Sequence, residues 1–404
     1  MDVLKGILAE VLEEVTPSKE EERVVMSRVD AFIKKLKVKD ADIILGGSGA
    51  KGTWLRNTFD IDLFVRFPKK YADKDISGIL EKALKPFGCE RYHGSRDYFR
   101  VRAGGFVYEI VPVINIRKSS EAFNLTDVSP LHSVWVKRNS GRALKGEIRL
   151  AKKFFKANNL YGAESYIRGF SGYVLEVLVI YYGGFVNLLK ASLKWKGKQV
   201  IDLKKFHKDV FFEVNSSKLV SPLILIDPVQ PGRNAAAALS LEKFNELKKL
   251  AKQFLGRPSK KFFEKPEINV DALKKKYFVL EAEVFSGKDD VVGCKVEKAF
   301  EFVSKKFEHC GFVIKKKGWS FGKFAVFYFD FESSVLPAEQ VVSGPPSRIK
   351  FHAEQFRRKY KAVEEKSGVL FAKIPRLFRT PESVVAEIMN DPYLADKVKN
   401  LGVV

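Results

Sequence analysis

Apolar residues at helical spacing open the chain and predict two helices. Residues 3–15 place leucine, isoleucine and valine at every third or fourth position, which is the period of one helix face. Pro17 ends this pattern. Ser18 followed three residues later by Glu21 predicts the capped start of a second amphipathic helix that runs to about Lys37.

The pattern then changes to short apolar runs, which predict strands around a glycine-rich turn. Residues 41–47 (ADIILGG) predict a strand that meets the turn, and residues 59–67 (FDIDLFVRF) predict the next strand. A helix is expected near 75–87, with strands near 97–103 and 106–114. Helices followed by a few strands in one compact region indicate an α/β or α+β domain.

Helical periodicity returns in residues 141–192, where we expect one helix from 141 onward and a second over 164–192. The apolar segment 170–189 could be mistaken for a membrane span. Glu176 and Asn187 interrupt it, so a buried helix of a globular protein is favoured and no membrane partner is expected.

The remaining pattern is mixed. A strand is predicted over 223–229 and a helix over 235–255, and the proline- and lysine-rich stretch 257–267 is the best candidate for a linker. Residues 277–334 then predict a strand, a helix at about 293–308 and two further strands, which together suit a small sheet with packed helices. The last seventy residues mix both patterns.

Composition narrows the class of partner. The 404 residues hold 72 Lys and Arg against 49 Asp and Glu, and 72 − 49 gives the net charge of +23. This excess favours a polyanion, either a nucleic acid or an anionic membrane, over a merely soluble basic surface. Three widely separated cysteines exclude a disulfide framework and a CxxC zinc pair, and no N-terminal signal pattern is present, so a reduced, cytoplasmic protein is expected.

Two carboxylates lie on the strand after the turn. Side chains at i and i+2 of a strand share a face, so Asp60 and Asp62 project together while Ile61 and Leu63 project to the other side. Such a pair repels unless a cation lies between its members, and hard oxygen ligands suit Mg²⁺ or Mn²⁺. Two metal ions are the usual device for in-line phosphoryl chemistry. A solvated strand edge remains the alternative reading of the spacing.

Glu109 is the candidate third carboxylate. It lies in VYEIVPVI, an otherwise apolar strand in which a lone acid is costly unless it is paired or bound to a metal. Taken by itself, it could equally be the partner of a salt bridge.

The turn itself is suited to a phosphate. Its glycines, Gly47 among them, let the backbone approach a ligand closely, Ser48 adds a hydroxyl and Lys51 a charge. A Walker A loop would need GxxxxGK followed by Ser or Thr, but Gly52 is followed by Thr53. The turn alone is weak evidence for a site. Its combination with an acid-x-acid strand a dozen residues later is more specific.

This combination resembles the polymerase-β-type nucleotidyltransferase superfamily. Within that superfamily the chain resembles the archaeal, class I CCA-adding tRNA nucleotidyltransferases, because the similarity continues through YEIVP, SPLHSVWV, FFKANNLYGAESYIRGFSGY and DPVQPGRNAAAALS. The resemblance is clear over about residues 40–260 and thinner toward the C-terminus. The run from Lys152 to Tyr173 is its most specific part.

The resemblance implies an α+β multidomain fold with four parts. These are a polymerase-β-like catalytic head (1–140), a mainly helical neck that completes the nucleotide site (141–258), a small RNA-recognition-like α/β body (259–340) and a short tRNA-binding tail (341–404).

The resemblance also assigns roles to residues. Asp60, Asp62 and Glu109 would be the catalytic carboxylates that hold two Mg²⁺ ions, with Mn²⁺ as an alternative. The nucleotide-binding residues would be Gly47, Ser48, Lys51, Lys152 and Tyr161 around the triphosphate, Arg233 at the incoming base, and His132 in a structural or sugar-adjacent role.

Three features depart from the family pattern. Many relatives place Glu first and Asp third in the acidic triad, whereas this chain has Asp60 and Glu109, so one metal position could be altered. Relatives also commonly have Arg where this chain has Lys51, and the C-terminal part is expected to be shorter than theirs.

The activity implied is template-independent addition of C, C and A to the 3′ end of tRNA from CTP and ATP, with release of pyrophosphate. The alternatives are a related enzyme such as a poly(A) polymerase, or a non-catalytic RNA-binding protein with a relict site. Whether the chain is a monomer or a homodimer is left open. Basic segments with aromatics at 194–198, 315–319, 356–361 and 371–379 are the candidate RNA contacts.

Overall fold

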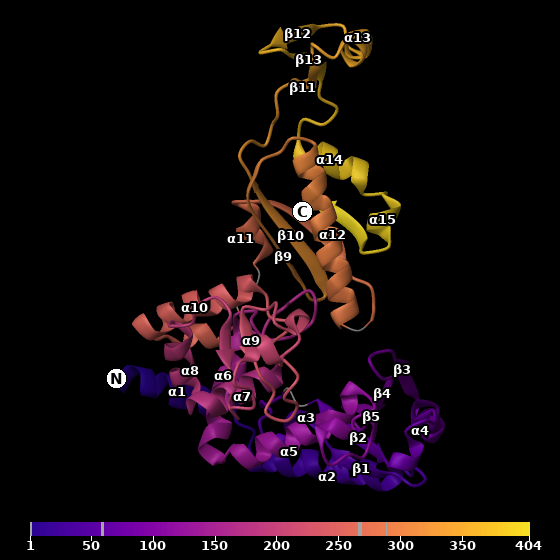
Figure 1. The fold of residues 1–404 in the computed structure, drawn as a ribbon, viewed down its shortest axis with the longest axis vertical. Coiled ribbons are helices and arrows are strands. Elements are labelled where there is room, and N and C mark those ends of the chain that lie inside the picture. The colour runs from indigo at the N-terminus through magenta and orange to yellow at the C-terminus, as the bar shows by residue number, and fades with distance from the viewer. Residues whose placement is uncertain (1, 58–59, 266–268, 288) are drawn as a thin grey trace. The chain divides into compact units, whose positions relative to one another are not determined.

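The computed structural model describes residues 2–57, 60–265, 269–287 and 289–404. By its internal contacts the chain forms two compact units, Met1–Pro266 and Glu267–Val404 (Figure 1). The boundary falls at the end of the predicted linker 257–267. The finer division into four parts stays a prediction.

A five-stranded sheet lies at the centre of the first part of the N-terminal unit. Its order is β1-β2-β5-β4-β3, in which β2 and β5 are parallel and the other pairs are antiparallel. Its strands are β1 (Asp42–Leu45), β2 (Ile61–Phe67), β3 (Cys89–Tyr92), β4 (Tyr98–Ala103) and β5 (Phe106–Ile114). The predicted strand 59–67 therefore begins at Ile61, and Phe59 lies outside the described residues.

One face of this head sheet is covered by α2 (Lys19–Lys35) and α4 (Ile76–Leu84). Ile61, Leu63 and Val65 of β2 are fully buried against them, as the alternation predicted. The side chain of Ser18 accepts a hydrogen bond from the Glu21 backbone NH at 3.0 Å, which confirms the predicted cap of α2. The even-numbered residues of β2 are left for the other face.

Helices form the second part of the same unit. Its main members are α1 (Asp2–Val15), α6 (Arg142–Ala157), α7 (Gly172–Tyr182), α8 (Phe185–Ser192) and α10 (Leu241–Gly256), which share one apolar core. Helix α1 precedes the head in sequence, yet Val11 and Val15 are buried in this core. Helix α5 (Ser129–Asn139) connects the head to α6 and was not predicted.

The predicted single helix over 164–192 is wrong. Helix α7 starts only after Ser171, whose side chain accepts a hydrogen bond from the Val174 NH at 3.2 Å, and Gly162 and Arg168 before it have positive φ. At the other end Gly183 and Gly184 have φ of 71° and 149°, and α7 and α8 meet there at a bend of 92°. The chain turns by about a right angle at these residues because glycine tolerates backbone angles that a continuous helix excludes.

The remaining elements of this part are short. They comprise β6 (Gln199–Ile201), which pairs in parallel with β7 (Leu223–Leu225), and α9 (Val210–Glu213). The predicted helix 235–255 begins later, at Leu241, after the Ser240 cap. Within the predicted linker, residues 260–263 form a short 3-10 turn whose Phe263 is buried in the helical core, so that portion is not a linker.

The C-terminal unit contains a four-stranded antiparallel sheet of order β14-β8-β10-β9. Its elements are β8 (Phe278–Glu283), α12 (Asp289–His309), β9 (Ile314–Phe321), β10 (Phe324–Phe331), α14 (Pro381–Ile388), α15 (Pro392–Ala395) and β14 (Lys399–Val403), preceded by α11 (Val270–Lys274). The predicted order of strand, helix and two strands over 277–334 is confirmed. FAVFYFDF is the core strand β10, with Phe327 and Phe329 packed under α12.

A separate three-stranded sheet is inserted between β10 and α14. It consists of β11 (Glu339–Pro346), β12 (Val363–Lys366) and β13 (Val369–Pro375) in the order β11-β13-β12, with α13 (Lys350–Lys359) against β11. The predicted basic segment 356–361 lies at the end of α13 and the start of the next loop.

None of the helices in the described part of the chain is long and apolar enough to cross a membrane by itself; the bent pair α7 and α8 meets the criterion only when both are counted together. Six residues of α7 are buried in the helical core, Glu176 among them. This burial agrees with the interpretation of 170–189 as an interior helix.

Candidate active site

The glycine-rich turn forms a short helix, α3 (Gly47–Lys51), between β1 and β2. The Gly46 NH donates to the Asp62 carbonyl at 2.8 Å, and the Gly52 and Thr53 NH groups close the turn on the Ser48 carbonyl. Gly47 has φ of 52°, and a Cβ at this position would collide with the Asp62 carboxylate. Glycine is therefore required here both by its backbone angle and by the close approach of a catalytic candidate.

Asp62 and Glu109 are direct neighbours across the parallel pair β2 and β5. Register partners in a sheet share a face, so the strand pairing brings together two acids that are separated by 47 positions in sequence, 109 − 62. Asp60 lies just before β2, two positions from Asp62. Sheet geometry thus places the three predicted carboxylates at one end of the face opposite to α2 and α4.

The negative charges of these acids repel one another, so ionisation of one carboxyl group disfavours ionisation of the others. Burial is the largest cause that raises the pKa of Asp62, and the negative charges of Glu109 and Asp60 add to it. Lys51 and Lys152 oppose these effects, and the resulting pKa is about 7. Burial, followed by Glu109, also raises the pKa of Asp60. A divalent cation among such oxygens would relieve this repulsion, so the residues present fit a hard metal ion by donor type and by charge.

One of the three candidate metal ligands, Glu109, also contacts a cationic side chain of the protein. A carboxylate oxygen of Glu109 accepts a hydrogen bond from Arg100 at 2.6 Å, and that guanidinium lies 5.0 Å from the centre of the Tyr92 ring. Among the residues that the structure describes, no three His, Cys, Asp or Glu side chains stand in an arrangement ready to hold a metal. Glu109 thus has a cationic partner within the protein in addition to its acidic neighbours.

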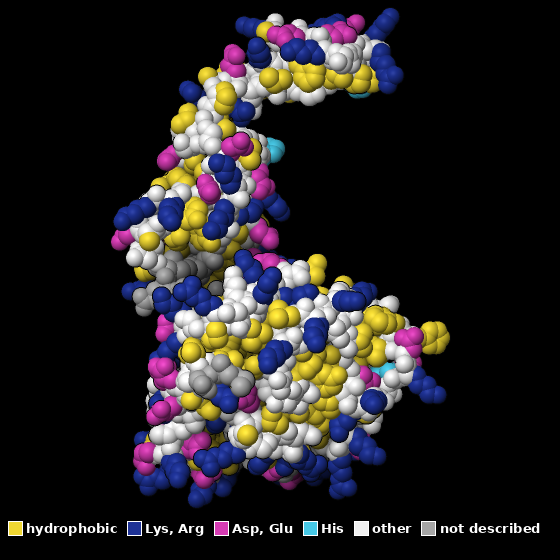
Figure 2. Space-filling model, turned by 90° about the vertical axis from the view of Figure 1, so that its left-hand side faces the viewer, with side chains coloured by type: hydrophobic (Ala, Val, Ile, Leu, Met, Phe, Trp, Pro, Cys, Tyr) yellow, Lys and Arg dark blue, Asp and Glu magenta, His cyan; other side chains and the backbone are white. Residues whose placement is uncertain are grey.

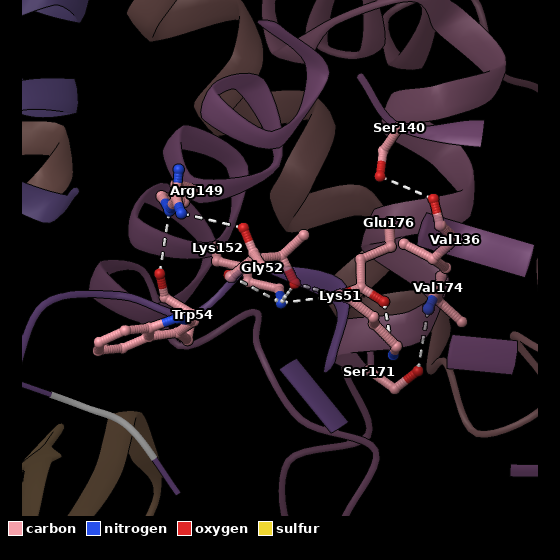
Figure 3. A network of polar contacts seen from close by, with 11 residues as sticks. Lys51, Gly52, Trp54, Val136, Ser140, Arg149, Lys152, Ser171, Val174 and Glu176 are labelled. Carbon is pink, nitrogen blue, oxygen red and sulfur yellow. Dashed lines mark hydrogen bonds and ion pairs between the residues drawn. The ribbon is translucent and has the colours of Figure 1, made fainter. Parts of the chain in front are cut away.

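A buried ionic network lies behind α3. The Lys51 amine donates to one oxygen of Glu176 at 2.8 Å, and the Lys152 amine donates to the other, also at 2.8 Å (Figure 3). Thr53 donates its hydroxyl to Glu176 at 2.7 Å and accepts from Lys152 at 2.9 Å. Burial by itself would raise the pKa of Glu176, but Lys152 and Lys51 outweigh it and lower that pKa to about 2. The ionised Glu176 thus joins the turn, α6 and α7.

Arg149 holds the loop that follows α3. Its guanidinium donates to the Trp54 carbonyl at 3.0 Å and to the Gly52 carbonyl at 2.9 Å (Figure 3). Arg149 is buried, and this burial lowers its pKa. It stands one helical turn before Lys152, so α6 contacts the turn through two cations on one face.

Tyr161 lies where the chain leaves α6 and forms an isolated bridge with Phe170. Its hydroxyl lies against Gly172 at the start of α7, and burial raises the pKa of that hydroxyl. The Lys156 amine lies 4.9 Å from the centre of its ring. Burial lowers the pKa of Lys156, against the effect of the negative charge of Asp60. Lys156 is thus a cation near the carboxylates that sequence reasoning did not single out.

A second polar cluster is centred on Asp227. This buried carboxylate contacts His132 Nε2 at 2.9 Å, accepts from the Tyr173 hydroxyl at 2.9 Å and accepts from Arg233 at 2.8 Å. Burial alone would raise the pKa of Asp227, but the hydrogen bond and charge of His132, the Val229 NH and the charge of Arg233 together outweigh it, and the pKa falls to about 2. The clusters adjoin, because Lys51 lies 5.6 Å from the centre of the Tyr173 ring.

The structure therefore places the predicted residues in three groups. Asp60, Asp62 and Glu109 lie with Gly47 and Ser48 at the turn, Lys51 and Lys152 meet at Glu176, and His132 and Arg233 meet at Asp227. Sequence reasoning missed Glu176, Asp227 and Arg149 as parts of the site. An acid inside an apolar segment is the signal that singled out Glu109 on its strand, and the same signal was available for Glu176 on its helix.

A glycine-rich turn, a two-acid strand and a third acid on the parallel neighbour define the polymerase-β-like class of nucleotidyltransferase. Residues 26–94 match the family model described as "Nucleotidyltransferase domain". The fold also resembles solved structures of a cytoplasmic RNA terminal U-transferase (TM-score 0.51, 15% identity, 66% of this chain and all of that one) and of the Cid1 poly(U) polymerase (TM-score 0.52, 15% identity, 64% and 98%).

More specific matches cover two later parts of the chain. Residues 146–264 match the model described as "tRNA nucleotidyltransferase, second domain", and residues 282–399 match "CCA-adding enzyme, C-terminal domain". The CCA-adding enzyme of Methanosarcina mazei is 30% identical over 93% of this chain and 87% of its own length, and that of Methanosarcina barkeri is 32% identical over 90% and 84%. The Nanoarchaeum equitans enzyme is 44% identical, over 57% of this chain and 60% of its own. The chain belongs to the CCA-adding enzyme family.

Proposed function

We propose that this protein completes the 3′ end of tRNA by adding C, C and A in turn from CTP and ATP, without a nucleic acid template. The observation that carries the proposal is the pairing of Asp62 with Glu109 beside the glycine-rich α3, in a chain that matches CCA-adding enzymes over most of its length. In each cycle the terminal 3′-hydroxyl of the RNA attacks the α-phosphorus of the nucleotide and pyrophosphate leaves.

Nucleotidyltransferases of this class use divalent metal ions. Asp60, Asp62 and Glu109 are the residues that would hold them here, and we assign two Mg²⁺ ions, with Mn²⁺ as a substitute. When bound, such ions polarise phosphoryl oxygens and lower the pKa of an attacking hydroxyl. The hydrogen bond with Arg100 uses one oxygen of Glu109, so this carboxylate retains a second oxygen for the role.

The polar groups of the chain are assigned to parts of the nucleotide. Ser48 and Lys51 on α3, with Lys152 and Tyr161 from the helical part, are assigned to the triphosphate. Two lysines against one glutamate leave an excess of one positive charge at this place, 2 − 1, which favours an anionic group.

Arg233 is assigned to the incoming base. It is held by Asp227, and its guanidinium is partly exposed, with 40% of the side chain accessible. His132 shares the same carboxylate and stacks near Tyr173, with ring centres 4.2 Å apart, so its role is to orient this cluster.

The tRNA partner is supported by charge. Lys and Arg side chains are spread over the visible surface of each unit (Figure 2), in keeping with the net charge of +23. Such a surface meets phosphates without reading sequence, which is sufficient for an acceptor stem. A homodimer and a cytoplasmic location stay predictions.

The test is an incorporation assay with tRNA that ends at its discriminator base. With CTP alone we expect two additions, and with CTP and ATP together we expect three, the last of them A. ATP alone should give no product on this substrate but one addition on tRNA that already ends in CC. Long A tails would instead indicate a poly(A) polymerase. Salt-sensitive binding of tRNA without incorporation would indicate a non-catalytic RNA-binding protein.

A further inference from the structure

Glu176 is a buried acid for which the catalytic assignments above provide no role. Its side chain is 1% exposed in the middle of α7, a helix that is otherwise apolar where it is buried. Each of its two carboxylate oxygens contacts a different lysine at 2.8 Å (Figure 3). Lys51 comes from α3 and Lys152 from α6, so one carboxylate connects three elements.

The two lysines are not equivalent. The Lys152 amine donates to Glu176, to the Thr53 hydroxyl and, at 3.2 Å, to the Thr53 carbonyl, which accounts for the three donors of an ammonium group. The Lys51 amine donates to Glu176, and in the described part of the chain it makes no other hydrogen bond. Two donors of Lys51 therefore remain for a ligand, whereas Lys152 is saturated by the protein.

Stability alone is a poor explanation for this network. Burying charges costs free energy that their attraction often does not recover, and apolar replacements of similar volume are commonly as stable. A carboxylate that holds an ammonium group can instead favour ligand binding. The lysine side chain is already ordered before the ligand arrives, so less conformational entropy is lost on binding. The groups that face Glu176 are Lys51, Thr53 and Lys152, and Tyr161 and Tyr173 lie within electrostatic range.

We propose that Glu176 is a positioning residue for the triphosphate of the incoming nucleotide, which it serves by fixing Lys51 at the turn and by anchoring Lys152 behind it. The inference rests on the proposed function. It predicts that Lys51 makes the direct phosphate contact and that Lys152 acts mainly through Glu176. Because the triphosphate is common to CTP and ATP, both substrates should depend on Glu176 equally.

The test is the Glu176→Gln variant of the full chain, assayed for C addition and, on tRNA ending in CC, for A addition. We expect the KM for CTP and the KM for ATP to rise together by about tenfold. The KM for tRNA should not change. A merely structural role would reduce the folded fraction and therefore kcat per total protein, while leaving the KM for either nucleotide unchanged. Unchanged KM values for CTP and ATP in an active variant would overturn the inference.

Further variants keep the test decisive. Glu246→Gln is the matched control, because it removes a partly exposed carboxylate that pairs with Lys243 at 2.8 Å on α10, away from the turn, and it should alter neither KM. If Glu176→Gln does not fold, the double variant Glu176→Gln with Lys152→Met restores the net charge of the cluster. It should fold and show a KM for CTP above that of Lys152→Met alone, in which Glu176 still fixes Lys51; equal KM values would contradict the inference.

Failure of the proposed function is distinguishable from failure of the inference. If the wild-type protein adds no nucleotide to tRNA, the proposed function fails. The binding of CTP to wild type and to Glu176→Gln, measured by equilibrium dialysis, then decides the inference. A roughly tenfold weaker affinity of the variant supports it, and equal affinities reject it.

Discussion

Asp62 is the residue on which the catalytic assignment depends most. It pairs in register with Glu109, accommodates the turn at Gly47 and is flanked by Asp60. Replacing it by Ala should lower nucleotide transfer by more than about 10³-fold, because the three carboxylates act as one unit and the loss of one removes most of the catalytic effect of all three. The affinity for tRNA should change little, as measured by filter binding.

The matched control is Asp42→Asn. Asp42 lies on β1 of the same sheet and forms an exposed ion pair with Arg66, away from the carboxylate cluster. This variant should retain transfer. An active Asp62→Ala variant would show that the site is wrongly assigned.

The raised pKa of Asp62 predicts a pH effect in metal-free protein. A carboxyl whose pKa is about 7 when folded and about 4 when unfolded binds more protons in the folded state between these values. Its contribution to stability therefore falls as the pH rises from about 4 to about 7. In chelator, the melting temperature of wild type should fall relative to that of Asp62→Asn by at least about 3 °C over this window.

Magnesium should reverse this difference at pH 7.5, because the ion favours the ionised carboxylate. Melting curves of both proteins at pH 5 and pH 7.5, with and without Mg²⁺, are the measurement. Parallel pH profiles in chelator would mean that Asp62 titrates normally.

Gly47 gives a third prediction at this scale. An alanine there would adopt an unfavourable φ and place its Cβ against the Asp62 carboxylate, so Gly47→Ala should lose about 1–3 kcal/mol of stability and most of its activity. Gly105→Ala separates the two causes. Gly105 also has a positive φ, 82°, but its Cβ would meet open space, so this variant should lose stability and keep activity.

At the scale of elements, the contact between α6 and the turn positions the residues assigned to the nucleotide. Arg149 on α6 donates to two carbonyls of residues 52–54, and Lys152 contacts Thr53 beside them. Replacing Arg149 by Met leaves both carbonyls without these donors inside the protein. We expect a loss of about 2–4 kcal/mol in thermal or urea unfolding and a raised KM for CTP. Arg142→Met, at the exposed start of the same helix, should change neither.

Local patterns predicted the elements that contain the carboxylates. Alternation on β2 and the apolar run of β5 were sufficient to place Asp62 and Glu109 on strands. The helix cap at Ser18 was predicted from the spacing of Ser18 and Glu21. The break between α7 and α8 was missed because residues 170–189 have no period that distinguishes one buried helix from two. Gly183 and Gly184 were the available signal for it.

Contacts between residues far apart in the sequence could not be predicted from local patterns. Glu176 lies 125 residues from Lys51, and Asp227 lies 95 residues from His132, so only the tertiary fold reveals these contacts. The same holds for Arg100, which the register of β4 and β5 places opposite Glu109. For Lys152 the predicted residue lies at the site, but its amine contacts protein groups.

At the scale of the whole molecule, the charge of +23 predicts salt-dependent tRNA binding. Displacement of counterions from RNA by Lys and Arg should weaken the affinity for tRNA at least about tenfold between 50 and 200 mM salt. Asp62→Ala should show the same slope as wild type, because it leaves the basic surface intact. Affinity that does not respond to salt would argue against a phosphate-based contact.

The packing of α1 restricts how the head can turn. Residues 2–15 belong to the helical core and so do residues from 142 onward, while the intervening sheet domain is joined to that core by two chain crossings, near residues 16–18 and 140–141. The head is also joined to that core by side chains, because Leu55 packs in it and Lys51 contacts Glu176 of α7. Any rotation of Asp62 relative to Glu176 therefore has to break these contacts as well as bend the two chain crossings.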